Sequence, residues 1–508
     1  MFRVFGRFII FSEAIGQSKE TRHSRRNRPQ GARIMECFLF FALTISVASL
    51  YGESPSNGFY VAPNGNDNSP GTLAQPFATL GKAQSAMRAS SSIKTTYIRA
   101  GLYKPLAVEK ASCMNGDKSS ASVDLHGVDS GETWSYYPPD GFNSAILDGQ
   151  STVGHSGRNG GGNGTGCAFS GYKPSNIKII GLQFQNYLYS AFWVNTGTGL
   201  AFVENIVHNL TAAAWGAGAV SMMCAPGTVI KNNYIYDVAY TGTELETRAD
   251  CPGGISGDVV SGNIIENSCT WPATPGFGND QNGGDCGAIY FDDKISPAST
   301  EIQVENNYIR DVNVSSKGAG DNGKNGKGGC CAIGVYLDDG TSNVAVTGNV
   351  IGGIASSCFH LHGGDNNSIT NNICDLANSE YQSIAIYQQS KAQHEMSGNS
   401  FTNNIVISAS KSGSSGFVGY QSPPNPIAIS NNVYFNCSGP KLKSTGTGGV
   451  GSDSSPVFQN PLVTGWTYDI SEESPANKDP ISFQKIKGDW GPPNLHFPQQ
   501  GTPPSCSR

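Results

Sequence analysis

Apolar and polar positions alternate along most of the chain, and the alternating stretches end in a recurring short unit. The unit is a β-branched run, then most often Asn or Gly, then Asn, then two apolar residues. Residues 301–309 (EIQVENNYI) and 342–350 (SNVAVTGNV) show the period of two that marks half-buried strands. The eight copies centre on Asn205, Asn233, Asn263, Asn307, Asn349, Asn372, Asn404 and Asn432. Helical periodicity is nearly absent, so the pattern predicts repeated strands and turns.

The spacing of these asparagines predicts a β-solenoid. The intervals run from 23 residues, between Asn349 and Asn372, to 44, between Asn263 and Asn307. Such intervals are too short for separate domains and suit one coil of a solenoid with variable loops. Asn tolerates left-handed backbone geometry at a tight bend, and its amide can bond the equivalent Asn of the next coil. We therefore expect a ladder of stacked asparagines; the alternative is a set of unrelated surface turns.

The beginning of the alternating region carries a family resemblance. Phe59–Met87 (FYVAPNGNDNSPGTLAQPFATLGKAQSAM), followed by Thr95–Tyr103 (TTYIRAGLY), resembles the start of right-handed parallel β-helix proteins of the pectin lyase-like superfamily. The resemblance implies an all-β, single-stranded right-handed parallel β-helix with a short N-terminal capping helix. Ala83–Met87 is the candidate for that helix, which would cover unpaired strand edges. The superfamily includes polysaccharide lyases, glycoside hydrolases, uronate epimerases and phage depolymerases, so the resemblance leaves the reaction open.

Four segments follow from these patterns. Residues 1–34 are a basic extension or reflect a misassigned start, residues 35–51 are a signal peptide, residues 52–465 form the β-helix, and residues 466–508 are an extended C-terminal tail packed on the solenoid. The apolar run CFLFFALTISVASLY in the second segment is too short to span a membrane, which takes about 20 apolar residues. A buried strand is the alternative. We expect secretion, to an extracellular or periplasmic space, and no stable membrane insertion.

Cysteine content agrees with export. The chain has 13 Cys, and removal of Cys37 with the signal peptide leaves an even number. An even set in an oxidising compartment predicts several disulfides, and the adjacent Cys330 and Cys331 are expected to pair with different neighbours. The cysteines lack metal-finger spacing, so no zinc site is predicted.

The charge balance narrows the class of partner. The chain has a formal net charge of −6, and its first 51 residues are basic, so the remainder is more acidic still. Nucleic acid is disfavoured because it needs a basic stripe. A polysaccharide is the expected partner, and a monomer is the default because the fold needs no second chain to close.

Acidic residues and histidines cluster in three successive predicted coils: 283–294 (GGDCGAIYFDDK), 334–340 (GVYLDDG) and 358–367 (CFHLHGGDNN). In each Asp-Asp pair, one carboxylate should face outward and the other inward or into the bend. Outward carboxylates about 4.8 Å apart raise each other's pKa and suit acid and base roles in glycoside cleavage. Asp-Asp-Gly is also ordinary turn chemistry, which is the alternative. The catalytic candidates are Asp292, Asp293, Asp338, Asp339, His360 and His362.

The asparagine markers also predict how these coils stack. Asp339 and His362 both lie ten residues before a marker, so they should be neighbours on adjacent coils. The shared Tyr-x-Asp-Asp pattern places Asp293 beside Asp339 by the same logic.

Aromatic and basic residues near these coils are candidates for substrate binding. Tyr and Trp rings can lie against the apolar faces of sugars, and Lys or Arg can hold a uronate carboxylate or act as the base of a lyase. The substrate-binding candidates are Tyr290, Tyr336, Trp215, Tyr387, Lys294 and Arg310. No cofactor is required, but Ca²⁺ would suit the carboxylates, with Asp285 and Asp365 as candidate ligands. Two glycine-rich insertions, 269–284 and 315–329, are expected to wall the cleft.

Together these features predict a secreted enzyme that cleaves glycosidic bonds in a polysaccharide. Carboxylate-based hydrolysis is placed ahead of β-elimination by a lyase, because acidic residues dominate the cluster. Motifs typical of polygalacturonases are incomplete here, and the Asp-Pro-His-Asp motif of uronate epimerases is missing. A non-catalytic glycan-binding or adhesion protein, in which the Asp pairs are turn residues, is the alternative from a different class.

Overall fold

The computed structural model describes residues 57–106, 113, 120–151, 164–211, 216–251, 253–270, 285–295, 298–312, 332–376, 383–389, 395–409, 411, 416–496 and 506. Residues 52–508 form one compact unit. The predicted basic extension and signal peptide lie outside the described residues. Within the part of the chain that the structure describes, no helix is long and apolar enough to cross a membrane.

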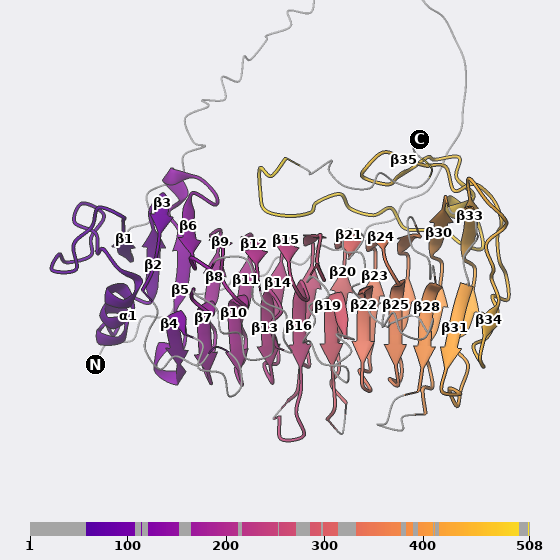
Figure 1. Cartoon of the computed structure of the whole chain (residues 1–508), viewed down its shortest axis with the longest axis horizontal. Coiled ribbons are helices and arrows are strands. Elements are labelled where there is room, and N and C mark those ends of the chain that lie inside the picture. Colours follow the sequence, from indigo (N-terminus) through magenta and orange to yellow (C-terminus); the bar gives the residue numbers. More distant parts are fainter. Residues whose placement is uncertain are drawn as a thin grey trace, which may run out of the picture. The chain divides into compact units, whose positions relative to one another are not determined.

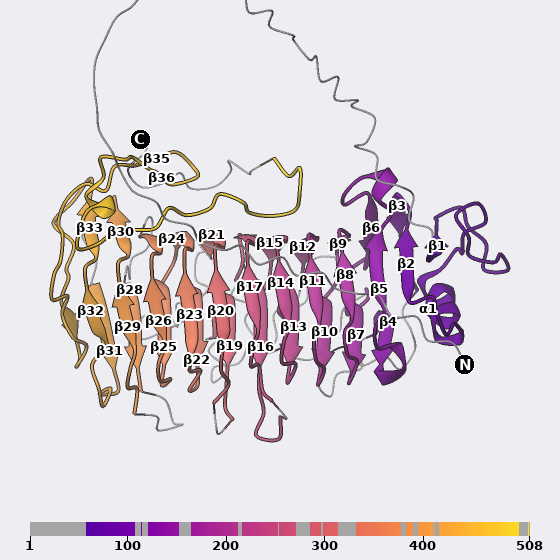
Figure 2. The ribbon, with the colours of Figure 1, turned by 180° about the vertical axis from the view of Figure 1, so that it is seen from behind.

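Short strands stack into three parallel sheets, because each full coil of the chain contributes one strand to each sheet (Figures 1 and 2). The first sheet contains, in spatial order, β1 (Phe59–Val61), β2 (Thr95–Ile98), β5 (Thr133–Tyr136), β8 (Lys178–Ile180), β11 (Ala201–Val203), β14 (Val229–Lys231), β17 (Val259–Ser261), β20 (Ile302–Glu305), β23 (Val344–Thr347), β26 (Ser368–Thr370), β29 (Ser400–Thr402) and β32 (Ala428–Ser430). The second sheet contains β3 (Gly101–Tyr103), β6 (Ala145–Asp148), β9 (Gln183–Gln185), β12 (Ile206–Leu210), β15 (Tyr234–Val238), β18 (Ile264–Glu266), β21 (Tyr308–Val312), β24 (Val350–Ile354), β27 (Ile373–Asp375), β30 (Ile405–Ser408) and β33 (Val433–Asn436).

The third sheet lies in front in Figure 1 and carries the candidate site. It contains β4 (Ala121–His126), β7 (Cys167–Tyr172), β10 (Ser190–Asn195), β13 (Val220–Met223), β16 (Thr243–Glu246), β19 (Cys286–Asp292), β22 (Ala332–Asp338), β25 (Ser357–His362), β28 (Ser383–Gln388), β31 (Gly416–Tyr420) and β34 (Gly446–Thr447). Short 3₁₀ turns lie at Gly127–Asp129, Pro138–Asp140 and Pro475–Asn477. The predicted parallel β-helix is confirmed.

Alternation of side chains explains why these segments are strands. In β20, Ile302 and Val304 enter the core while Gln303 between them is exposed. The next coil repeats this arrangement, because Ile302 pairs with Val344 and Val304 with Val346. Apolar residues of successive coils therefore stack on one another inside the solenoid, and burial of this continuous apolar stack favours the parallel register.

An asparagine ladder lies inside the bend between the first and second sheets. All eight predicted asparagines are fully buried. From Asn233 onward, the side-chain oxygen of each accepts from the backbone N–H and the amide of the asparagine one coil earlier; Asn263 donates to Asn307 at 3.0 and 2.9 Å. The first, Asn205, accepts from Leu182 N at 2.9 Å. The series ends at Asp453, whose carboxylate accepts from Asn432. The predicted ladder is confirmed, and its bonds satisfy backbone groups that the tight bend would leave unpaired.

One detail of the ladder prediction was wrong. The left-handed residue of each bend is the one before the ladder asparagine, as in Asn306 (φ 52°) and Gly348 (φ 67°). The ladder residue itself follows that turn and points its side chain into the solenoid. The residue before the ladder asparagine therefore turns the chain, and the ladder asparagine itself hydrogen-bonds to the next coil.

The N-terminal end of the solenoid is capped by α1 (Leu80–Ala89), the predicted helix. It begins three residues earlier than expected because the Thr79 side chain accepts from Lys82 N at 3.1 Å. Leu80, Ala83 and Met87 face the core, and the helix packs against β1, β2 and β4. This cap covers the first coil, where strand edges would otherwise be open.

Disulfides are present, as the cysteine content predicted; four of the described pairs lie within or between neighbouring coils, and the fifth joins the end of the solenoid to the C-terminal tail. The described pairs are Cys113–Cys167, Cys224–Cys251, Cys269–Cys286, Cys358–Cys374 and Cys437–Cys506. Cys330 and Cys331 lie outside the described residues, so the expectation for them stays a prediction.

The C-terminal tail covers the outer face of the second sheet from β18 to β33 (Figures 1 and 2). It includes a small antiparallel pair, β35 (Val463–Thr464) and β36 (Asp469–Ile470). Tyr308 donates to Trp466 O at 2.8 Å, and Tyr468 donates to Asp375 Oδ2 at 2.8 Å. A second apolar cluster forms there from strand residues and from the tail residues Val463, Tyr468, Ala476, Ile481, Phe483 and Trp490.

Candidate functional site

The candidate site lies on the outer face of the third sheet, where β16, β19, β22 and β25 run side by side (Figure 1). The inward residues of these strands, packed in the core, are Leu245, Phe291, Leu337 and Leu361. The residues on either side of them face outward and form two rows across the coils. The first row is Glu244, Tyr290, Tyr336 and His360. The second row is Glu246, Asp292, Asp338 and His362.

Asp338 in the second row accepts three hydrogen bonds. The Tyr290 hydroxyl donates to its Oδ2 at 2.7 Å, and the Asp339 N–H donates to its Oδ1 at 2.8 Å. His362 Nδ1 also donates to Oδ1, at 2.5 Å. Burial acts to raise the pKa of Asp338, but the bond and charge of His362 hold that pKa below its ordinary value. Burial conversely acts to lower the pKa of His362, and Asp338 raises it above its ordinary value. The pair therefore favours an ionised carboxylate beside a protonated imidazole.

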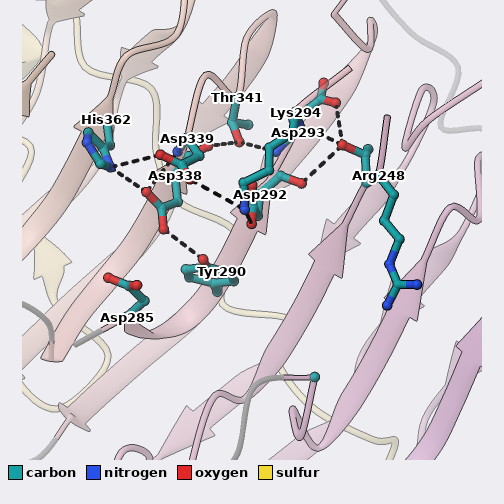
Figure 3. A network of polar contacts seen from close by, with 12 residues as sticks. Arg248, Asp285, Tyr290, Asp292, Asp293, Lys294, Asp338, Asp339, Thr341 and His362 are labelled. Carbon is teal, nitrogen blue, oxygen red and sulfur yellow. Dashed lines mark hydrogen bonds and ion pairs between the residues drawn. The ribbon is translucent and has the colours of Figure 1, made fainter. Parts of the chain in front are cut away.

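Lys294 joins two carboxylates at the end of the second row (Figure 3). Its ammonium contacts Asp292 Oδ2 and lies 3.4 Å from Asp339 Oδ2. Burial acts to lower the pKa of Lys294, but these two carboxylates raise it above its ordinary value. The Asp339 side chain is 34% exposed, and its Oδ1 lies 3.7 Å from His362 Nδ1. Asp339 is thus an accessible carboxylate held between two cationic groups.

Asp285, which directly precedes β19, belongs to the same electrostatic site. The Tyr336 hydroxyl donates to its Oδ1 at 3.3 Å, and the Tyr240 hydroxyl donates to its backbone carbonyl at 2.5 Å. Burial, and then the charge of Asp338, raise the pKa of Asp285 to about 6. One site therefore holds two carboxyl groups, Asp285 and Asp338, whose pKa values move in opposite directions.

Sequence analysis missed two glutamates that extend the rows by one coil. Glu244 is buried, and its carboxylate accepts from the N–H groups of Gly216 and Gly218 at 2.8 Å each. Burial, and then Glu246, raise the pKa of Glu244 well above its ordinary value. Glu246 pairs in register with Asp292 and is partly exposed. The alternating sequence TELE at residues 243–246 was the available signal, because it lies in register with IYFD (289–292) of the next coil.

The predicted stacking of the Asp pairs was wrong by one residue at His362. Asp338 and not Asp339 faces His362, because the register pairs Leu337 with Leu361. The bend after β22 holds one residue more than the bend after β25, since Val344 pairs with Asn367 of the next coil. Counting back from the asparagines could not detect that extra residue.

Asp293 is a bend residue and not a catalytic candidate. It is fully buried and accepts from Thr247 Oγ1 at 3.1 Å and from Ser299 N at 2.8 Å. The backbone prediction for the Asp-Asp pairs holds at this coil, because Asp292 faces the second row while Asp293 points into the bend. The structural alternative of turn chemistry is therefore correct for Asp293.

Three further candidates are buried beneath the site and do not face a substrate. Tyr290 and Tyr336 pack edge to face with centroids 5.2 Å apart, and His360 stacks on Tyr336 at 4.3 Å. Tyr290 is 5% exposed, and Tyr336 and His360 are 1% exposed. Burial lowers the pKa of His360 to about 3, so its imidazole is neutral. Tyr290 and Tyr336 were predicted to bind substrate and His360 to take part in catalysis, but all three form a buried layer. The two tyrosine hydroxyls donate to Asp338 and Asp285.

The remaining substrate and metal candidates lie elsewhere. Tyr387 is in the core and donates to Met396 O at 2.7 Å, so its ring cannot contact a substrate. Arg310 lies on the second sheet, where its guanidinium packs 4.3 Å from the Trp466 ring under the tail. Asp365 is a turn residue that accepts from Ser397 N at 2.7 Å. Trp215 and most of the two predicted cleft-wall insertions lie outside the described residues.

The residues fit calcium poorly. Asp338, Asp339 and His362 offer ligand atoms within 4.8 Å of one another. Ca²⁺ prefers oxygen ligands, and the imidazole nitrogen of His362 is not a ligand that it favours. The Lys294 ammonium also already lies against Asp339. Positive charge at this cluster is supplied by side chains.

The arrangement suits proton transfer near neutral pH. Asp285 can hold a proton up to pH about 6, while Asp338 is ionised well below that. Neighbouring carboxyl groups that titrate apart are the pattern of acid and base pairs in enzymes. Figure 3 shows Asp338, Asp339, Asp292 and His362 as one connected set of polar contacts, with the Arg248 guanidinium turned away from it.

Comparisons with known proteins agree with the fold. Residues 167–373 match the family described as right handed beta helix region. No curated protein matches the sequence. A solved structure of GH136 lacto-N-biosidase from Eubacterium ramulus is similar, with a TM-score of 0.47 and 12% identity over 80% of this chain and 67% of that chain.

Two other solved structures have a similar backbone course. A rhamnogalacturonan lyase has a TM-score of 0.44 and 12% identity, over 88% of this chain and 97% of that chain. PfbA, a surface adhesin of Streptococcus pneumoniae, has a TM-score of 0.43 and 11% identity, over 72% of this chain and 89% of that chain. The stacked parallel sheets and the match over residues 167–373 show that this chain has the fold of a right-handed parallel β-helix.

Proposed function

We propose that this protein hydrolyses glycosidic bonds of a polysaccharide on the outer face of the third sheet. The observation that carries the proposal is the raised pKa of Asp285 in the same site as the exposed Asp339 carboxylate, which lies between Lys294 and His362. Glycoside hydrolysis needs one protonated carboxyl and one ionised carboxylate at the same time. Burial favours the protonated form at Asp285, and Asp339 offers a carboxylate that a substrate can reach.

Asp285 is assigned as the proton donor. Its raised pKa keeps the carboxyl neutral up to pH about 6, where it can protonate the oxygen of the leaving sugar as the glycosidic C–O bond breaks. The Tyr336 hydroxyl orients this carboxyl from the buried layer. Protonation of the leaving group is worth roughly two to four orders of magnitude in rate.

Asp339 is assigned as the second carboxylate, which attacks the sugar or activates a water. Among the carboxylates joined to Lys294 and His362 it is the most exposed, at 34% against 9% for Asp292 and 6% for Asp338. Asp338 is a positioning residue, because it anchors both the Asp339 N–H and the His362 ring. Lys294 and His362 then face the substrate as cationic groups beside the attacking carboxylate.

The basic residues support hydrolysis over β-elimination. A lyase needs an unprotonated base beside a uronate carbon. Lys294 has a raised pKa under the influence of Asp292 and Asp339, and His362 has a raised pKa under that of Asp338. Arg310 lies on another sheet. The described basic residues near the site are therefore held in their protonated forms.

The proposal includes secretion of the protein as a monomer. Five described disulfides support an oxidising compartment, because such bonds rarely persist in a reducing cytosol. The polysaccharide is then met outside the cell or in the periplasm.

The test is an assay of the purified chain from Leu50 onward on a panel of polysaccharides, following reducing ends and ultraviolet absorbance together. The variant Asp339→Asn removes the attacking carboxylate while keeping its size. Asp124→Asn is the matched control, because Asp124 lies on β4 of the same sheet and contacts His126 at 2.9 Å, several coils from the site. We expect reducing ends without absorbance, a loss of about 100-fold or more in Asp339→Asn, and an unchanged rate in the control.

Two outcomes would contradict the assignment. Release of reducing ends with a matching rise in absorbance would establish a lyase, because β-elimination leaves an unsaturated sugar. Binding of a polysaccharide without any cleavage, equally in wild type and Asp339→Asn, would favour the adhesion protein.

A further inference from the structure

A second polar cavity lies far from the carboxylate rows, between the C-terminal tail and the bends that join the first and second sheets. Its volume is about 390 Å³, within the range of small-ligand sites. Residues of five successive coils form its floor, and Gln484–Asp489 of the tail form its roof. We call it the tail cavity.

The tail bridges the cavity because it is attached at both ends. At one end, Gln484 N donates to the side-chain oxygen of Asn371 at 3.4 Å. At the other end, Gly491 N donates to Gly262 O at 2.8 Å. These anchors lie three coils apart, which corresponds to about 14 Å along the solenoid. Between them Ile486 packs onto the apolar cluster of the second sheet, which holds the roof in place.

The floor of the tail cavity is rich in hydrogen-bonding groups. Asn306 is the left-handed bend residue and lines the cavity, whereas the ladder residue Asn307 after it is buried in the solenoid. Glu305 and Thr347 lie beside it and are half-buried. Amide, hydroxyl and carboxylate groups of this kind can bond several sugar hydroxyls at once.

Three lysines give the tail cavity its charge. Lys231 stands at the floor, and Lys485 and Lys487 belong to the roof. Within the described ranges, none of the three forms an ion pair, although Glu305 and Asp489 line the same cavity. Lys231 acts electrostatically on Glu204, outside the cavity lining. Cations on opposite walls of a cavity attract an anion placed between them.

We propose that the tail cavity binds an acidic sugar residue of a polysaccharide, one that carries a carboxylate or a sulfate. The anionic group lies among the three lysines, and the sugar hydroxyls bond the floor. The site holds the polymer without cutting it. This inference does not depend on the proposed hydrolysis, because the two sites share no residue.

Binding is measured by affinity electrophoresis and calorimetry with polygalacturonate, dextran sulfate and neutral dextran. Every protein carries Asp339→Asn, so that cleavage does not consume the probe. The test variant adds Lys231→Gln, Lys485→Gln and Lys487→Gln. The matched control adds Lys104→Gln, Lys178→Gln and Lys478→Gln, which removes the same charge from exposed lysines of the solenoid and tail. Equal melting temperatures confirm that both sets fold.

We expect an acidic polymer to bind, and the test variant to bind about tenfold more weakly than the control. Comparison of polygalacturonate with dextran sulfate identifies which anionic group the site takes. Thr347→Trp, which fills the floor without changing charge, should weaken binding as well. Equal loss in test and control variants, tight binding of neutral dextran, or no binding of either acidic polymer would overturn the proposal. Failure of hydrolysis in the unsubstituted chain would leave this result unaffected, so the two proposals fail separately.

Discussion

One additional residue in a single bend determines how the candidate site is assembled. The bend after β22 contains Asp339 in a left-handed conformation, with φ 38°. As a result Asp338 reaches His362, and Asp339 turns to solvent beside Lys294. The sequence predicted that these residues cluster, but it placed Asp339 and not Asp338 beside His362. Counting residues back from the asparagines assumes that every bend has the same length, and these two bends differ by one residue.

At this scale the Asp338–His362 pair yields a prediction. Asp338 raises the pKa of His362 above its ordinary value. Asp338→Asn removes the largest influence that raises this pKa, while burial still lowers it and the weaker charges of Asp339 and Asp285 remain. The midpoint of the His362 ring signals in an NMR titration should therefore move to lower pH. Asp124→Asn should leave this midpoint where it is. An unchanged His362 midpoint in Asp338→Asn would show that the carboxylate does not hold the ring.

At the scale of elements, the fold could be predicted from the sequence largely because of the asparagine ladder. Its eight asparagines recur in one apolar context, so their stacking could be predicted without knowledge of the loops. The loop lengths, the tail and the exact bends could not be predicted, because no periodic signal governs them. Tyr290, Tyr336 and His360 were predicted to be accessible, but they are buried. No periodic signal in the sequence shows whether polar side chains on the outer face of a sheet are covered by other residues.

Removal of one ladder residue should destabilise the whole solenoid. Asn307→Ala deprives the Asn263 N–H and the Val260 carbonyl of their partners inside the protein. We expect a loss of at least about 2 kcal/mol in the free energy of unfolding, measured by urea denaturation. Asn425→Ala removes an exposed side chain with a single bond to Glu395 O and should cost less than about 1 kcal/mol. Equal costs would mean that the ladder contributes little.

The Cys269–Cys286 disulfide should influence activity as well as stability. Cys286 begins β19 and follows the proposed proton donor, Asp285. Replacement of both cysteines by Ser should lower stability by about 3 kcal/mol and also slow cleavage. Cys113 and Cys167 are also in the core, but Cys167 begins β7, several coils from the site, so their double Ser variant should lose stability alone. The cleavage rates of the two double Ser variants are compared well below both melting temperatures. Equal rates would mean that the Cys269–Cys286 disulfide does not influence the site.

At the scale of the whole molecule, buried carboxyl groups should make stability fall as pH rises. Burial is the main cause that raises the pKa of Glu132 to about 8 and of Glu266 to about 7. A raised carboxyl pKa means that the folded state binds the proton more tightly than the unfolded state. The resulting stabilisation is complete below the ordinary carboxyl pKa and is lost as pH rises through about 7 and 8.

Glu132→Gln tests this pH dependence. The amide cannot ionise, so the variant should keep more of its stability between pH about 5 and about 9 than the wild type does. The measurement is the urea midpoint at several pH values, with Glu301→Gln as an exposed control. Parallel curves for wild type and Glu132→Gln would contradict the assigned cause.

The pH dependence of cleavage tests the central claim most directly. Reducing ends and ultraviolet absorbance are followed for wild type and Asp285→Asn from pH about 4 to about 8. We expect reducing ends without absorbance, a wild-type rate that falls as pH rises through about 6 because Asp285 loses its proton, and a rate at least about 100-fold lower in Asp285→Asn. A full rate in Asp285→Asn, or a wild-type rate that does not fall through this range, would contradict the assignment of Asp285 as the proton donor.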